Sequence, residues 1–223
     1  LGTIHNDDGV PSVTINDVST AEGNSGTSNA VFVYSLSTAS TQTVTVNFTT
    51  AAGTASAGTD YTSKSGTLTF NPGITLQRDT ILITGDLLDE NDETFFINLS
   101  NATNAAIGDA QGAGIITDDD ALPNISINDI SVVEGNSGTT NAQFTVRLTP
   151  ASGRTVTANY STANGSATEP SDYASASGSV TFNAGDTAKQ VSVSVNGDVT
   201  NEPDEVFNVN LSGPSNANIS DAQ

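Results

Sequence analysis

The chain of 223 residues repeats itself at a spacing of 112 positions, and no gap is needed to align the two copies. Equivalent residues coincide along the whole length, as the pairs Glu22 and Glu134, or Asp60 and Asp172, illustrate. A repeat of this length has the size of a domain with its own hydrophobic core, and it is much longer than the unit of a solenoid. The sequence therefore predicts two tandem domains with the same fold.

Apolar and polar residues alternate with a period of two in short segments, which is typical of β-strands with one buried face. β-branched residues are abundant, turn residues separate the segments, and no stretch shows a helical period. The first repeat has seven predicted strands, at residues 13–15, 30–36, 44–49, 66–70, 80–83, 95–99 and 114–116. The second has six, at residues 125–127, 142–148, 155–161, 178–182, 190–195 and 206–211. The predicted fold is all-β, with two tandem immunoglobulin-like antiparallel β-sandwiches.

The phase of the repeat predicts the domain boundaries. Residues 11–122 form one complete sandwich, and residues 123–223 form a second that lacks its final strand. The counterpart of that strand lies in residues 1–10, because Gly2 to Asp8 corresponds to Gly114 to Asp120. These ten residues are either the last strand of a preceding repeat or a donor strand that completes the second sandwich of a neighbouring copy. A head-to-tail contact of the second kind does not close, so it builds a filament.

The charge of the chain restricts its partners. It has 25 acidic and 5 basic residues and a net charge of −20, which argues against nucleic acid and against anionic membrane surfaces. No apolar run is long enough for membrane insertion. The chain has no cysteine and one histidine, which excludes a thiolate zinc site and a cysteine nucleophile. Paired carboxylates occur in a crowd of loops and not in an apolar cleft that would separate their pKa values, so no enzyme is predicted.

Acidic residues are concentrated where strands end. Ten of the thirteen acidic residues in 11–122 lie in four segments, each after an odd-numbered predicted strand. Alternate loops of an antiparallel sandwich gather at one end, so these four segments should meet there; we call this end the loop pole. Crowded carboxylates must protonate or recruit cations. Ca²⁺, with six to eight oxygen ligands in flexible geometry, suits mobile loops better than Mg²⁺.

The predicted Ca²⁺ ligands of the first repeat are Glu22, Asp60, Asp86, Asp89, Glu90, Glu93, Asp118, Asp119 and Asp120. Those of the second are Glu134, Asp172, Asp198, Glu202 and Glu205. Asp60 can also be read as a turn former, Glu22 as a solvated bend, and Asp17 as either a ligand or a turn residue. The second repeat has Asn201 and Pro203 in place of Asp89 and Asn91, so it should bind fewer ions or bind them more weakly.

Four motifs in this order resemble the Calx-β domain, of the type found in bacterial surface proteins. They are Glu-Gly-Asn-Ser-Gly-Thr from Glu22 and from Glu134, Gly-Thr-Asp-Tyr around Asp60, the run from Gly85 to Phe95, and Ile-x-Asp-Asp-Asp at 116–120. The resemblance implies a seven-stranded sandwich. It also implies calcium at one pole, on residues matching Glu22, Asp60, Asp86, Glu90, Glu93 and Asp118–Asp120, although some members of the family are plain spacers.

These observations favour an extracellular or cell-surface structural or adhesive repeat in which Ca²⁺ at the pole and in the linker stiffens a tandem array. The expected partners are neighbouring repeats or identical chains. A filament subunit assembled through residues 1–8 is the alternative, and a calcium sensor or an accessory domain of an enzyme is a third reading.

Overall fold

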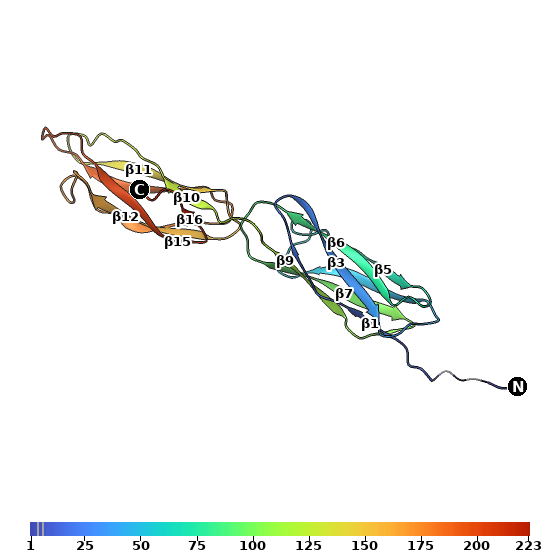
Figure 1. The fold of residues 1–223 in the computed structure, drawn as a ribbon. Coiled ribbons are helices and arrows are strands. Elements are labelled where there is room, and N and C mark those ends of the chain that lie inside the picture. Colours follow the sequence, from blue (N-terminus) through green and yellow to red (C-terminus); the bar gives the residue numbers. More distant parts are fainter. Residues whose placement is uncertain (4, 6) are drawn as a thin grey trace. The chain divides into compact units, whose positions relative to one another are not determined.

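The computed structural model describes residues 1–3, 5 and 7–223, and every regular element in them is a β-strand (Figure 1). The described chain forms two compact units. The first comprises Leu1–Asp86 and Asn91–Asp119, and the second comprises Leu87–Glu90 and Asp120–Gln223. The all-β prediction is confirmed. None of the described residues forms a helix that could cross a membrane.

The first unit is a sandwich of two sheets. Its strands are β1 (Ser12–Ile15), β2 (Val18–Ala21), β3 (Gly26–Leu36), β4 (Val44–Ala52), β5 (Ser65–Phe70), β6 (Leu76–Gly85), β7 (Glu93–Thr103), β8 (Ala106–Ile107) and β9 (Gln111–Thr117). One sheet has the order β6-β3-β1-β8 and the other β2-β9-β7-β4-β5. All seven predicted strands lie within these elements, and β2 and β8 are additional.

The extra strand β2 arises because the first strand changes sheets. β1 pairs with β3 in one sheet, whereas β2 pairs in parallel with β9 in the other. Two side chains hold the crossover: Asn16 Oδ1 accepts a hydrogen bond from Val33 N (2.6 Å), and Asp17 Oδ1 accepts one from Ala113 N (2.7 Å). Asp17 is therefore a structural residue that joins the two sheets.

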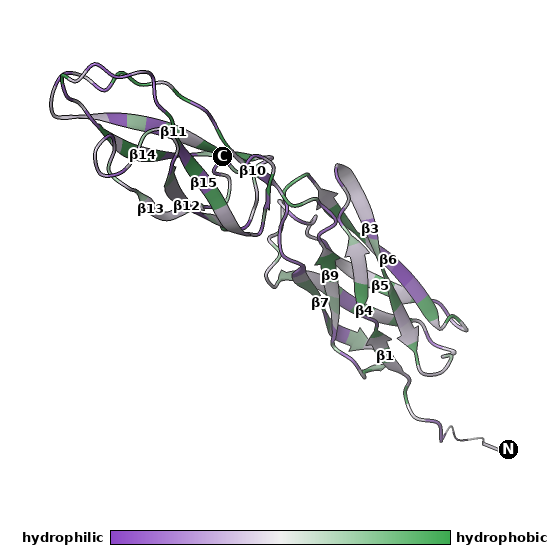
Figure 2. Ribbon diagram, turned by 60° about the vertical axis from the view of Figure 1, so that its left-hand side comes forward, coloured by the Kyte–Doolittle hydropathy of each residue, from purple (hydrophilic) through white to green (hydrophobic). Residues whose placement is uncertain are grey.

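The core of the first unit is formed by the inward-facing residues of both sheets, as the alternating hydropathy along the strands in Figure 2 illustrates. Phe95 on β7 lies at its centre. Its ring stacks on Tyr61 at a centroid distance of 4.6 Å and meets the edge of Phe32 at 5.9 Å. All three rings are fully buried. Aromatic packing of this kind contributes beyond the area that it buries.

The second unit repeats this sandwich with fewer strands. They are β10 (Asn124–Ile127), β11 (Thr139–Thr149), β12 (Val156–Asn164), β13 (Ser177–Phe182), β14 (Ala188–Asn196), β15 (Phe207–Ser215) and β16 (Asn218–Ile219). The first sheet keeps its four strands in the order β14-β11-β10-β16, whereas the second sheet has three, in the order β13-β12-β15. Residues 130–133, the counterparts of β2, form no strand, and Gln223 corresponds to the first residue of β9.

Candidate metal centre

A cluster of carboxylates forms where β2 and β9 end. These strands run in parallel, with Ala21 beside Thr117, so their following residues emerge together. Glu22 follows β2, and Asp118 and Asp120 follow β9. One carboxylate oxygen from each of these three residues lies within 4.8 Å of the others. The parallel pairing of two distant segments is thus what brings the acidic side chains together.

The backbone around this cluster is held by further acidic residues. Asp119 Oδ1 accepts a hydrogen bond from Gly23 N at 3.0 Å, and Asp92 Oδ1 accepts one from Asp118 N at 3.1 Å. Glu22 is only 6% exposed. At Gly85, the last residue of β6, a Cβ would lie 1.8 Å from the carbonyl oxygen of Gly23, so only glycine permits this close approach. The cluster is therefore supported by β6 as well as by β2 and β9.

The remaining predicted ligands of the first repeat have other surroundings. Asp60 Oδ2 accepts a hydrogen bond from Ser56 N at 2.6 Å, as a turn-forming aspartate does. Asp86 is exposed at the end of β6, and Glu93 is half-buried at the start of β7. None of these three belongs to the group formed by Glu22, Asp118 and Asp120.

Asp89 and Glu90 belong to the second compact unit. The Asp89 side chain is buried, with 3% of the residue exposed. Its Oδ1 atom lies 3.3 Å from Nη1 of Arg154 in an ion pair, and its Oδ2 atom accepts a hydrogen bond from Ser152 Oγ at 3.1 Å. This carboxylate is thus engaged by a guanidinium group and a hydroxyl group.

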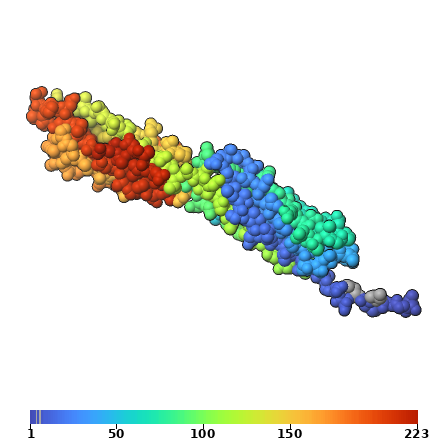
Figure 3. Space-filling model, viewed as in Figure 1, coloured from blue at the N-terminus to red at the C-terminus, as the bar shows by residue number. Residues whose placement is uncertain are grey.

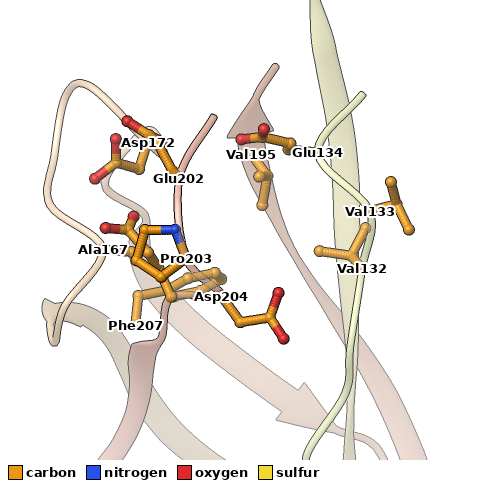
Figure 4. A pocket seen from close by; sticks show the side chains of 11 residues that line it. Val132, Val133, Glu134, Ala167, Asp172, Val195, Glu202, Pro203, Asp204 and Phe207 are labelled. Atoms are coloured by element: carbon orange, nitrogen blue, oxygen red, sulfur yellow. The ribbon is translucent and has the colours of Figure 1, made fainter. Parts of the chain in front are cut away.

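A second cluster lies in the second unit and draws on different positions of the repeat. Asp172, Glu202 and Glu205 each place a carboxylate oxygen within 4.8 Å of the others. They line a cavity of about 350 Å³, with Glu134 across the opening from Asp172 and Glu202 (Figure 4). The exposed residue Asp198, also a predicted ligand, instead accepts a hydrogen bond from Thr200 N at 2.6 Å.

The three carboxylates of this second cluster differ in protonation behaviour. The pKa of Glu202 is raised chiefly by loss of water contact and further by repulsion from Asp198, Asp172 and Glu134. The pKa of Glu205 is likewise raised chiefly by loss of water contact and further by repulsion from Asp172 and Glu202. The pKa of Asp172 is lowered, chiefly by the hydrogen bond that its carboxylate accepts from Thr168 N at 2.7 Å. The cluster therefore favours either uptake of protons or binding of a cation.

The two clusters show complementary parts of the predicted site. The cluster after β2 and β9 assembles Glu22, Asp118 and Asp120, whereas the other assembles the counterparts of Asp60, Glu90 and Glu93. Both groups consist only of carboxylates, the oxygen donors that suit Ca²⁺. Sequence reasoning did not assign the supporting hydrogen bonds of Asp17 and Asp92, because both depend on which distant backbone amides lie nearby.

The sandwich fold and the carboxylate clusters at strand ends define a class of tandem β-domains with acidic loops. The sequence pattern of the Calx-beta domain matches residues 5–121 and again residues 118–222. The chain belongs to the Calx-β domain family, with two copies in tandem. No curated protein sequence matches it.

Several solved structures are similar. CBD12 from CALX1.2 has 27% sequence identity over 92% of this chain and 80% of that chain, with a TM-score of 0.46. The calcium binding domain CBD12 of CALX1.1 has 24% identity over 91% and 79% of the two chains, also with a TM-score of 0.46. The apo form of the Calx CBD1 domain has 28% identity over 48% of this chain and 98% of that chain, with a TM-score of 0.41.

Proposed function

We propose that both domains bind Ca²⁺ through their acidic loops and that the chain serves as a calcium-stabilised structural repeat outside the cell. The observation that carries this proposal is the convergence of carboxylates from separate segments in each of the two clusters. Membership of the Calx-β family and the acidic composition support it. After β2 and β9, Glu22, Asp118 and Asp120 would hold the ion, with Asp119 fixing the loop. In the second unit, Asp172, Glu202 and Glu205 would do so.

Thermal melting tests this proposal. The melting temperature of the chain should rise when Ca²⁺ replaces chelator, because a cation that binds only the folded state adds to its stability. One site adds about 2.7 kcal/mol at free Ca²⁺ 100-fold above Kd. An equal concentration of Mg²⁺ should stabilise less, because Mg²⁺ requires near-ideal octahedral order. Identical melting curves in Ca²⁺ and in chelator would remove the calcium function and leave a spacer.

The proposed effect of Ca²⁺ extends to the junction between the domains. Asp118 and Asp120 lie where the chain passes from the first unit to the second. A cation bound by both of them and by Glu22 would tie this junction to the loop after β2. We therefore expect fewer conformations of the two-domain chain with Ca²⁺ than with chelator. Small-angle scattering should show a narrower distribution of interatomic distances with Ca²⁺ than with chelator. The double variant Asp118→Asn, Asp120→Asn is the control, and its scattering should be the same in both conditions.

A filament subunit assembled head to tail is a second candidate function, and the sequence match between Gly2–Asp8 and Gly114–Asp120 favours it. An unpaired strand edge is a ready template for an incoming strand. Residues 1–8 are the segment proposed to fill it, although Ile4 and Asn6 lie outside the residues that the structure describes. Negative-stain microscopy should then show linear assemblies, and single monodisperse particles at high concentration would contradict this role.

A further inference from the structure

We propose that the outer edge of β14 is a self-association site, through which two copies of the chain pair their second units as antiparallel strands around Gln190. Residues 188–192 of each copy would form the paired edge. A contact of this kind joins two identical chains about a two-fold axis, so it closes after two copies. It depends neither on the proposed calcium function nor on either end of the chain.

β14 is the outermost strand of its sheet and pairs with β11 along its inner side (Figure 2). Its outer side is covered at one end. There Ala174 N donates a hydrogen bond to the oxygen of Ser194 at 2.9 Å, and Asn196 N donates one to the oxygen of Asp172, also at 2.9 Å. Every second residue of an antiparallel strand turns its N–H and C=O groups to the same side. The other outward groups therefore lie in residues 188–192.

The outward groups of this uncovered end belong to Ala188, Gln190 and Ser192. All three residues are exposed, and no hydrogen bond joins these backbone groups to another residue that the structure describes. Residues between β12 and β14, in orange, reach the surface of the second unit in the space-filling view (Figure 3). A row of unpaired N–H and C=O groups is a template for pairing with another strand.

The equivalent edge in the first unit, on β6, is closed by two charged residues. Lys64 Nζ donates a hydrogen bond to the outward oxygen of Thr80 at 3.3 Å and forms an ion pair with Asp79. The Asp79 side chain, 14% exposed, alternates with the buried residues Ile81 and Ile83 and so points into the sandwich. Lysines and inward-pointing charges at an edge prevent pairing with another chain.

The second unit lacks both of these charges. The counterpart of Lys64 is Ala176, and the counterpart of Asp79 is Val191, which is 2% exposed in the core. Nothing in the described residues replaces the Lys64 cap on the outward oxygen of Ser192. The two repeats thus share a fold but differ in how they protect the same edge.

The register around Gln190 suits a second copy of the same strand. An axis at Gln190 places this residue opposite itself, and it places Ala188 opposite Ser192 of the other copy. About six hydrogen bonds would form, because each of the three facing pairs exchanges two. In the first unit the same arrangement would place Arg78 opposite Arg78, and like charges directly opposite each other are destabilising.

The charge of β14 also favours pairing with itself. The whole chain has a net charge of −20, so most of its surfaces repel a second copy. Residues 187–196 contain no acidic residue, and their one basic residue is Lys189. The Lys189 ammonium group forms an ion pair with Asp186 at 2.6 Å, and in the proposed register Lys189 faces Val191 of the other copy. A single pair of strands makes a small interface, so association should be weak and reversible.

Sedimentation of the full chain over a range of concentrations tests the proposal. A reversible dimer is expected, and Gln190→Pro should lower its association constant roughly tenfold, because proline removes the N–H group at the axis. The amide of Gln190 does not pair with β11, so the fold should tolerate this change, as a melting curve can verify. Arg78→Pro, the matched variant in the first unit, should leave association unchanged. A chain that stays monomeric, or assemblies that persist in Gln190→Pro, would overturn the proposal.

A second pair of variants tests the axis and leaves the backbone unaltered. Gln190→Arg introduces the residue of the first unit and should weaken the dimer roughly tenfold at low salt, because two like charges then face each other. High salt should restore much of the loss. Gln190→Met, neutral and of similar length, should retain the dimer. Equal association constants for Gln190→Arg and Gln190→Met at low salt would overturn the pairing around Gln190.

Discussion

Phe95→Ala should lower the free energy of unfolding of the first unit by about 3–5 kcal/mol, the usual range for removing a buried phenylalanine from a core. Phe95 is fully buried between Tyr61 and Phe32, and β9 covers its remaining face. Neighbouring strands on both sides limit the collapse that could fill the cavity. A large cost is therefore expected.

Phe207→Ala is the matched variant in the second unit and should cost clearly less. Its ring makes the same two aromatic contacts but is only partly buried. Hydrogen exchange followed by mass spectrometry resolves the stability of each unit through its own peptides. Equal losses for Phe95→Ala and Phe207→Ala would contradict the inference that Phe207 is less completely buried than Phe95.

Gly114→Ala is predicted to be a second strongly destabilising change, by about 1–3 kcal/mol, because it overpacks the core. The added methyl group would lie 2.3 Å from the Phe95 ring, so β9 or the ring must move. Since β9 also leads to Asp118 and Asp120, its displacement should weaken stabilisation by Ca²⁺ in the same variant.

Chemical denaturation of Gly114→Ala measures the loss of stability, and Gly2→Ala provides its control. Gly2 has no atom within 4 Å of the position that a Cβ would take, so this substitution should leave the stability of the monomeric chain unchanged. Wild-type stability in Gly114→Ala would show that β9 does not lie as closely over Phe95 as described.

Much of the fold could be predicted because the buried strands have a clear alternation of period two. The strand at residues 30–36, for example, lies within β3, and its inward positions Ala30, Phe32 and Tyr34 are all buried. The same pattern did not reveal β2. A strand that changes sheets keeps its local alternation, and the change depends on the hydrogen bonds of Asn16 and Asp17 to distant strands.

The candidate site was predictable to a smaller degree. The spacing of acidic segments after alternate strands predicted that their carboxylates would meet, and the structure brings some of them together, such as Glu22 and Asp118. It could not indicate that Asp89 pairs with Arg154, because an ion pair between residues 65 positions apart in the sequence leaves no local pattern. Nor could it separate Asp60, whose carboxylate closes a turn, from Asp172, whose carboxylate closes a turn and also joins a cluster.

Calorimetric titration of the full chain with Ca²⁺ tests the central claim most directly. The wild-type chain should bind Ca²⁺ at two classes of site, one at each cluster. Glu22→Gln should remove binding at the cluster after β2 and β9, and Glu205→Gln should weaken binding at the cluster of Asp172, Glu202 and Glu205, while each variant retains binding at the other cluster. Absence of heat and of saturation in the wild-type chain, or titrations of both variants that match the wild type, would contradict calcium binding by these carboxylates.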